Sequence, residues 1–518
     1  MKDVQRDASL LKRAFFYTLI FSLAAHAYMY FSLALSHDSL HSAIIGDREI
    51  AGQISLGRFM QPVYWLVRGR MAVPWLIGAL SILFLTGSSF LILQVLGIEN
   101  RVSVALLCGI FSTNLTVTAA NATYMPWADV YALALLLACC GVYLWERCAG
   151  WGCVAAMPLF ALSMGLYQAY IDVAIGLALI LLIRYIAEGE PFSRLWRRAV
   201  RYAVSLLGGA AMYFVLMKLT MRLSGTEMAD TYNGLTNLLD SDIVSLLRLV
   251  PSAYFDFAAV LLSPLRSYNT VSVCVCTGLS WGIGALLWAR CLRRRHIRGA
   301  ALALGALCVA LLPLGLNFVY VLAAGQTHLL MTFSFFLVYA VVLLPLEARE
   351  TLPSAALPHP ISICRTALFL LCGAMIFQNV VYANGAYFEK RLIFESTSQY
   401  AYSIVETMER DPAYEPGVTP VAVIGEFPRS YMDRDDGEEF SRYRHLTGMW
   451  DGTSITYLTS FGSYCDHVLG HPVDLITDAS TLTEIAVRRA TREMPVFPKE
   501  GYCQMADGVM IVKLEDLF

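Results

Sequence analysis

Residues 14–35 have the sequence AFFYTLIFSLAAHAYMYFSLAL, and residues 36–71 continue it as SHDSLHSAIIGDREIAGQISLGRFMQPVYWLVRGRM. The first segment contains no Asp, Glu, Lys or Arg and is long enough to cross a bilayer as a helix. The second segment follows directly and concentrates acidic, basic and histidine side chains, which a plain linker between membrane helices does not need. This order predicts a first membrane helix that delivers a loop rich in reactive side chains to the far side of the membrane.

The composition places the chain among multi-spanning membrane proteins. It has 518 residues, of which 57% are hydrophobic and 15% charged, and a mean hydropathy of +0.57; soluble domains carry about 25% charged residues. Its apolar runs have helical length, which excludes a barrel built from strands of about ten residues. The formal charge of −2 and the short, scattered basic clusters indicate no nucleic-acid partner.

We predict an all-α polytopic bundle of about 11 transmembrane helices. These helices cover approximately residues 14–35, 73–97, 102–119, a run ending at 145, two runs within 151–187, 202–220, 270–289, 299–323, a run ending at 346, and 366–384. The run 151–187 is too long for one span, and the polar residues of MGLYQAYID mark the turn that divides it. The segment 251–264 is either re-entrant or interfacial.

The distribution of basic residues sets the predicted orientation. The segments assigned to the cytoplasm hold about 18 Lys and Arg, whereas the two long outward loops, 36–72 and 221–269, hold about 8 although they are longer. This excess puts the N-terminus in the cytoplasm and the C-terminus outside. The transmembrane bundle is predicted to cover residues 1–386.

Residues 387–518 are predicted to form a soluble extracytoplasmic α/β domain. Short apolar runs such as VTPVAVIGE and VMIVKL alternate there with turn signals and helix-like stretches. Cys465 and Cys503 are the two cysteines of this polar region; outside the cytoplasm they could pair in a disulfide, although the sequence does not give their separation. The other eleven cysteines lie in or beside apolar runs, where a small soft side chain mainly packs.

Asp38 is the leading candidate for catalysis in the first loop. A carboxylate just past a membrane helix is partly desolvated, which raises its pKa and makes it a useful base. His37 could tune that carboxylate, and Arg58 could bind an anion. The alternative is that Asp38 only caps the short helix SLHSAI. His37, Asp38 and His41 also have a spacing compatible with metal ligands, but no third protein ligand follows at fixed spacing, and no metal is assigned.

The remaining loop acids and the basic residues each allow two interpretations. Asp47 and Glu49, with Arg48 between them, are either further reactive groups or the solvated start of a helix lying on the membrane. Five basic residues are suited either to bidentate contact with a lipid phosphate or to lipid headgroups at the interface: Arg58, Arg68, Arg70, Lys218 and Arg222.

Aromatic and polar residues near the outward helix ends form a third group. The aromatic side chains could stack on a sugar, although an interfacial aromatic belt predicts the same residues: Trp65, Tyr124, Trp127, Tyr167 and Tyr170. Polar residues at membrane depth are candidates for function by default: Asp129, Gln168 and Asp172. Asp129 or Asp172 could also supply a second carboxylate beside Asp38.

The first loop with its following residues, SHDSLHSAIIGDREIAGQISLGRFMQPVYWLVRGRMAVPWLIG, resembles the N-terminal signature of the type II glucosyltransferase family. Its members are membrane enzymes that add glucose to bacterial surface polysaccharides, including O-antigen. The resemblance extends through FALSMGLYQAYI and, more loosely, through MPVFPKEGYCQMADGVMIVKL, and so covers most of the chain.

The resemblance implies a GT-C glycosyltransferase fold and a polyprenyl-phosphate sugar as the donor. It implies Asp38 as the catalytic carboxylate, acting as general base, with Asp47 and Glu49 as second choices, and Arg58 as the contact to the donor phosphate. The other expected substrate contacts are His37, His41, Arg48, Tyr124, Asp129, Tyr167, Gln168, Asp172, Lys218 and Arg222.

The same resemblance implies the chain's setting in the cell. The expected partners are the lipid-linked donor, a cell-surface glycan acceptor such as O-antigen or teichoic acid, membrane lipid, and a functional link to a donor synthase and a flippase. Because the departing lipid phosphate is already an anion, no cofactor or metal is required. The protein is expected in the bacterial plasma membrane with its active site outside.

Two other classes remain as alternatives. A transporter or flippase for a lipid-linked saccharide would also have about eleven spans, but it usually shows two related halves or broken helices at midplane depth, and no internal repeat is apparent. A non-enzymatic assembly scaffold would tolerate replacement of the loop acids and arginines.

Overall fold

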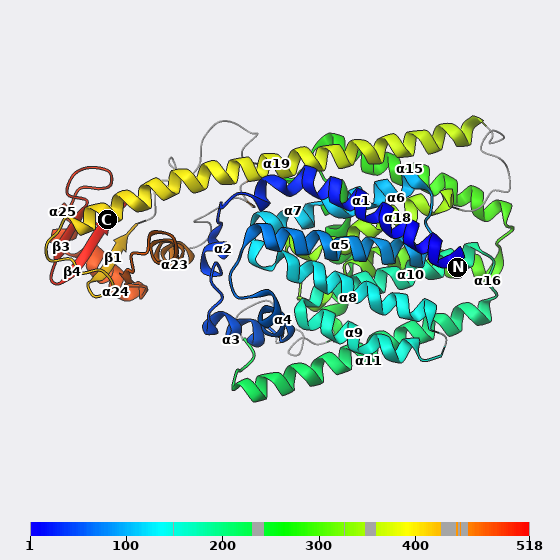
Figure 1. Cartoon of the computed structure of the whole chain (residues 1–518), viewed down its shortest axis with the longest axis horizontal. Helices are drawn as coiled ribbons and strands as arrows, with labels where there is room; N and C mark the ends of the chain where they lie inside the picture. The colour runs from blue at the N-terminus through cyan, green and yellow to red at the C-terminus, as the bar shows by residue number, and fades with distance from the viewer. Residues whose placement is uncertain are drawn as a thin grey trace.

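The computed structural model describes residues 2–148, 150–229, 243–325, 327–347, 359–425, 442–443, 446 and 454–516. Within them, ten helices are long and apolar enough to cross a membrane, by length and composition. Two shorter apolar helical segments, Gly152–Leu166 and Phe333–Leu346, lie in the same bundle. The chain is thus a polytopic helical membrane protein with a small sheet near its C-terminus, which confirms the predicted fold class (Figure 1).

The first half of the chain forms α1 to α11. Their bounds are α1 Lys2–Tyr30, α2 His37–His41, α3 Asp47–Ser55, α4 Met60–Arg68, α5 Pro74–Leu96, α6 Arg101–Thr113, α7 Leu115–Ala122, η1 Met125–Trp127, α8 Ala128–Arg147, α9 Gly152–Leu166, η2 Gln168–Tyr170, α10 Ile171–Ala187 and α11 Phe192–Ser224. Polar side chains cap the N-termini of two of them: the side chain of Asn100 caps α6, and that of Asn114 caps α7.

The second half completes the bundle and adds the C-terminal domain. Its bounds are α13 Ile243–Arg248, α14 Val250–Leu262, α15 Val271–Arg294, α16 Gly299–Leu316, α17 Phe318–Leu322, η3 Leu329–Met331, η4 Phe333–Leu337, α18 Val338–Leu343, η5 Leu344–Leu346, α19 His359–Glu409, β1 Pro420–Ile424, α23 Ser454–Tyr464, η7 Cys465–Leu469, β2 Asp474–Leu475, α24 Ala479–Val487, α25 Arg489–Glu493, β3 Cys503–Ala506 and β4 Val509–Lys513.

The turns predicted to be cytoplasmic come together at one end of the bundle, which we call the basic end. There Arg13 donates to the backbone oxygen of Glu99 at 2.8 Å, and Glu347 accepts from the backbone N–H of Glu99 at 3.1 Å. Arg295 likewise donates to the backbone oxygen of Ala187 at 3.0 Å. The opposite end carries the first loop and is called the loop end. The alternation of turns along the bundle therefore follows the predicted order.

The segment 251–264, which the sequence predicts to be either re-entrant or interfacial, lies in the half of the bundle nearest the loop end. After α14 the chain turns at residues 263–270 and enters α15, whose last turn is at the basic end. Asn317, at the loop end of α16, donates to the backbone oxygen of Ala253 at 2.9 Å. With α13 this segment, Val244–Leu262, is one of the ten apolar helices counted above, but the chain returns to the loop end after it. Of the two predicted alternatives, re-entrant and interfacial, this geometry matches the re-entrant one.

Helix α19 differs most from its prediction. It has 51 residues and continues without a break through the predicted boundary at residue 387, so the helix predicted at 366–384 is much longer (Figure 1). Buried side chains recur at helical spacing well past that boundary: Ala383, Ala386, Tyr387, Lys390, Phe394, Thr397, Ala401, Ile404 and Met408. The first of these pack in the bundle and the later ones in the C-terminal domain. Because this apolar face is buried first by the bundle and then by the C-terminal domain, the helix continues past the membrane surface.

The C-terminal domain contains a four-stranded sheet in the order β2-β1-β4-β3. Strand β1 is parallel to β2 and β4, and β3 is antiparallel to β4. The β3–β4 hairpin turns at Asp507 and Gly508, both with positive φ. The disulfide that the sequence allows is not formed, since Cys465 and Cys503 are both free thiols. Burial raises the pKa of each to about 12, which disfavours the thiolate needed for oxidation.

Candidate active site

Asp38 lies on α2, a five-residue helix at the loop end between the bundle and the C-terminal domain (Figure 1). Ser36 and Ser39 both donate their hydroxyls to the backbone oxygen of Thr123, at 2.6 and 3.0 Å. The side chain of Asp38 remains 34% exposed, and His37 Nε2 lies 3.3 Å from it. The serines on either side of Asp38 thus seat the helix on the bundle while the carboxylate stays accessible.

The first loop is closed at its base and carries Arg58 on a sharp helix end. Ile45 N–H bonds to the backbone oxygen of Arg70 at 2.9 Å. Helix α3 ends with Gly57 N–H bonding to Ile54 and Arg58 N–H bonding to Gln53, both at 2.9 Å, which is the pattern of a Schellman C-cap. Gly57 has φ +77°, and a Cβ there would lie 2.5 Å from the hydroxyl of Tyr213. Glycine is therefore required to place Arg58.

One N–H group of the Arg58 guanidinium has no hydrogen-bond partner among the described residues. Arg58 Nη1 donates to Gln53 Oε1 at 3.0 Å, and Gln53 Nε2 in turn donates to Glu49 at 2.7 Å. Its guanidinium lies 5.0 Å from the ring centre of Tyr167. Its Nε is buried and has no hydrogen-bond partner among the described residues. A buried, preorganised N–H without a partner is suited to an anionic ligand.

Arg58 lines an apolar cavity of about 220 Å³. The cavity runs between α9, α11 and α17, and most of its lining is aliphatic, aromatic or methionine: Met164, Ile171, Ala210, Phe214, Met217, Met221, Phe318, Leu322 and Met331. Tyr167 and Gln168 lie with Arg58 in its wall. One cation in the wall of an apolar cavity matches a ligand with an anionic head and an apolar portion next to it.

Two residues that the sequence did not single out join Asp38 to Arg58. Tyr131 of α8 interacts electrostatically with both, and so does His328, which precedes η3. Burial lowers the pKa of His328, and the charge of Arg58 lowers it further. A neutral imidazole that interacts electrostatically with Asp38 can accept a proton or a hydrogen bond. The only sequence signal for His328 is its place in the short outward turn AGQTHL.

Asp129, expected to contact substrate, is instead a structural anchor of the first loop. Its carboxylate is fully buried and pairs with Arg68 at 3.1 Å, and it accepts from the hydroxyl of Tyr64 at 2.8 Å. Arg68 is itself buried and also donates to the backbone oxygen of Pro126 at 2.8 Å. Burial and the neighbouring Asp129 raise the pKa of Tyr64. The arrangement ties α4 to the start of α8 and leaves no access for a substrate.

Asp172 and Gln168 also have structural partners. Asp172 is fully buried and accepts from the backbone N–H of Val319 at 2.9 Å, so that it caps α17. The substrate contact and the second carboxylate predicted from Asp129 and Asp172 are therefore not supported by their positions. Gln168 donates to the backbone oxygen of Leu56 at 2.7 Å and to the hydroxyl of Tyr213 at 3.0 Å. Gln168 therefore holds the first loop against the bundle, and its side chain also lines the apolar cavity.

The remaining predicted residues lie around the edge of this site or away from it. Asp47 is 92% exposed and pairs with Arg70 at 3.0 Å, and Arg48 is exposed on the same helix. Tyr124 interacts electrostatically with Tyr131. Lys218 and Arg222 are exposed on α11, each next in sequence to a buried methionine, Met217 or Met221. Among the described residues, no cluster of three or more His, Cys, Asp or Glu could hold a metal ion.

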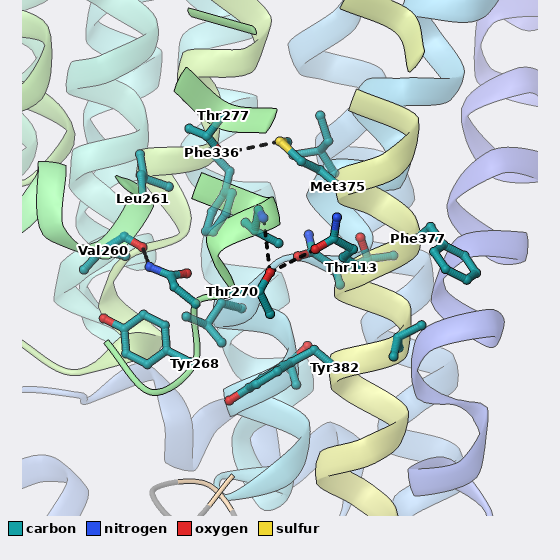
Figure 2. A pocket seen from close by; sticks show the side chains of 18 of the residues that line it. Thr113, Val260, Leu261, Tyr268, Thr270, Thr277, Phe336, Met375, Phe377 and Tyr382 are labelled. Carbon is teal, nitrogen blue, oxygen red and sulfur yellow. Dashed lines mark hydrogen bonds between the residues drawn. The ribbon is translucent and has the colours of Figure 1, made fainter. Parts of the chain in front are cut away.

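A second cavity of about 230 Å³ lies between α14, α15 and α19 (Figure 2). Figure 2 shows Tyr268 and Tyr382 at one end of it and Thr277 and Met375 at the other. Thr270 donates to Gln378 at 2.9 Å in its wall. No residue predicted from the sequence lines this cavity, and Asp38 and Arg58 both lie elsewhere.

Comparison with known families adds one match. The model of the family described as glucosyl transferase GtrII matches residues 27–344, more than half of the chain. The matched part contains the first loop, the apolar cavity and His328, and it ends before α19. No curated protein and no solved structure matches the chain.

Proposed function

The chain belongs to the GtrII glucosyl transferase family, and from this premise we propose that it moves a hexose, glucose, from a polyprenyl-phosphate donor to a cell-surface glycan. That the protein is a glycosyltransferase follows from its family, and that it is a membrane protein follows from its apolar helices. We place the reaction at the extracytoplasmic face of a bacterial plasma membrane, because the excess of Lys and Arg in the turns of the basic end favours a cytoplasmic position for that end.

The single observation that supports a lipid-phosphate donor is the position of Arg58. Its unpartnered Nε marks a place for an anion, and the apolar cavity behind it offers a place for a prenyl chain. Tyr131 and His328 each interact electrostatically with both Arg58 and Asp38, so we expect a phosphate bound to Arg58 to hold its sugar near these residues. The tyrosines beside Arg58 supply flat faces on which a sugar ring can pack.

The proposed chemistry is displacement at the anomeric carbon. An acceptor hydroxyl attacks that carbon while its proton passes to the carboxylate of Asp38, and the bond from the carbon to the phosphate oxygen breaks. The leaving group is the polyprenyl phosphate, whose charge Arg58 stabilises. Glu49 orients Arg58 through Gln53, and we propose this positioning role for Glu49 in place of a role as base.

The test uses purified full-length protein in detergent or vesicles with a panel of polyprenyl-phosphate hexoses and a glycan acceptor. We expect release of polyprenyl phosphate and glycosylated acceptor in equal amounts, with the glucose donor preferred. Movement of intact donor across vesicles without release of lipid phosphate would support the transporter alternative. The absence of both activities with every donor in the panel would overturn the proposal.

A further inference from the structure

The C-terminal domain lies outside the matched family region, yet it contacts the helix that carries Asp38. Helix α2 has five residues, too few to be stable alone, so its orientation must come from its neighbours. On the bundle side, Ser36 and Ser39 bind the backbone oxygen of Thr123, as described above. The buried Lys390 of α19 donates to the adjacent backbone oxygen of Ala122. This side fixes where α2 sits but not how it is tilted.

The hydrophobic contacts of α2 are made with the C-terminal domain. Leu40 is completely buried and belongs, with Ala34 and Leu35, to the core of that domain and not to the core of the bundle. The same core contains Phe461 of α23 and Phe394 of α19. The chain from the end of α1 to α2 is therefore packed as a part of the domain that follows it by more than 350 residues.

Two polar contacts from the domain fix the last turn of α2. His467 of η7 donates from Nδ1 to the backbone oxygen of Leu40 at 3.1 Å. Ser463 of α23 lies with its hydroxyl 3.1 Å from Nδ1 of His41. Both contacts bind residues that follow Asp38 within one helical turn. A change in either contact would tilt α2 about its anchor on Thr123 and displace the carboxylate.

We propose that the C-terminal domain is a component of the active site, with His467 and Ser463 as positioning residues for Asp38. The proposal rests on the proposed function, because it needs Asp38 to act in transfer. In this arrangement the domain sets the angle at which the carboxylate meets the acceptor, while the donor is bound by bundle residues alone. Loss of the two contacts should lower kcat and leave the KM for the donor unchanged.

The experiment measures kcat and donor KM for the double variant His467→Ala/Ser463→Ala in the full-length protein. A displacement of about 1 Å costs about a hundredfold in rate, so we expect kcat to fall about tenfold to a hundredfold with donor KM within about twofold. His467→Asn keeps an N–H near the position of Nδ1 and should recover most of the rate. Thr483→Ala, an exposed change on α24, is the matched control and should behave as the wild type.

A second measurement separates positioning from general damage to the fold. If the two residues act through Asp38, then adding His467→Ala to Asp38→Asn causes no further loss of kcat. Losses that multiply in the combined variant, or equal loss in His467→Asn and His467→Ala, would overturn the proposal. Failure of the proposed function would be different, because wild-type protein would then release no lipid phosphate at all.

Discussion

Arg58 and Arg68 lie ten residues apart in the same loop and have opposite surroundings. Arg68 is buried and engaged by Asp129 and a backbone oxygen, so its charge is balanced inside the protein. Each arginine has one buried nitrogen without a hydrogen-bond partner among the described residues, Nε of Arg58 and Nη2 of Arg68. Arg58, however, contacts the neutral Gln53 and the aromatic face of Tyr167, and among the described residues no carboxylate pairs with it. The difference teaches that a charged residue at a membrane surface is available for ligand binding only when its protein contacts leave its charge uncompensated.

Asp38 should show the largest effect on catalysis. Asp38→Asn removes the proton acceptor but keeps the shape of the side chain, so transfer should fall by about 10²- to 10⁴-fold. Assay of lipid-phosphate release at saturating donor measures the loss. Asp47→Asn, which changes an exposed acid of the same loop, is the control and should keep near-normal activity. Comparable losses in the two variants would remove Asp38 from its assigned role.

The ion pair of Arg68 should affect folding instead of the reaction. Arg68→Met leaves the carboxylate of Asp129 buried without its cation, which should destabilise the protein by about 3–5 kcal/mol. Thermal unfolding in detergent, followed by fluorescence, measures this change. Arg68→Met/Asp129→Leu removes both charges and should recover much of the stability. A stable but inactive Arg68→Met protein would contradict the structural role.

Arg58 should affect the reaction with little effect on folding. Arg58→Gln keeps a hydrogen-bonding side chain but loses the positive charge on the leaving phosphate, so kcat should fall by about 10²- to 10³-fold. The melting temperature should stay close to that of the wild type, in contrast to Arg68→Met. If Arg58→Gln lost stability and kept its rate, the comparison between the two arginines would be reversed.

Gly57 should affect the reaction through the position of Arg58, and it therefore extends the comparison between Arg58 and Arg68. Gly57→Ala forces a side chain into a left-handed conformation and against the hydroxyl of Tyr213. We expect about a tenfold loss of kcat from misplacement of Arg58, measured as above. Gly57→Ala/Tyr213→Phe removes the contacting oxygen and should recover part of the rate, whereas Gly46→Ala has open space and should be neutral.

His41 should give the smallest effect, a pH dependence of domain docking. Burial lowers the pKa of His41 below its ordinary 6.5; nearby Asp38 opposes this shift, whereas His37, His467 and Arg48 add to it. The unfolded state therefore binds a proton more readily than the folded state. This contribution to stability is complete above about pH 6.5 and is lost as the pH falls below it. Melting temperatures between pH 5 and 8 should rise with pH, and His41→Gln should flatten the rise.

The fold was largely predictable from the sequence because its signals are local. Apolar length fixes the spans, and basic clusters mark the turns of one end. The exceptions have local causes too: α19 passes residue 387 because its apolar spacing continues, and Val244–Leu262 is long and apolar enough for a span although the chain returns to the loop end after it. The apolar spacing of these segments is visible in the sequence, but where each helix ends and whether it crosses the membrane depend on what it packs against.

The site was predictable only in part, because its contacts connect distant residues. The signature SLGRF indicates Arg58, and its glycine explains the helix end that places it. Asp129, in contrast, was expected in the site because its partner Arg68 lies 61 residues away, and no local pattern links them. His328 and Tyr131 could not be ranked for the same reason. Long-range burial decides which of several similar residues stays accessible.

Helix α19 is a single long helix that connects the membrane bundle to the C-terminal domain. Its 51 residues correspond to a length of about 76 Å, against a hydrocarbon core of about 30 Å, so well over half of it extends beyond the lipid. The N-terminal half of α19 packs among the membrane helices as far as Tyr387, whose hydroxyl lies 2.7 Å from Nδ1 of His26, and its C-terminal part packs in the domain that contacts α2. A single continuous helix thus sets the distance between the bundle and this domain, and in the proposed reaction the acceptor hydroxyl would have to reach Asp38 between the two.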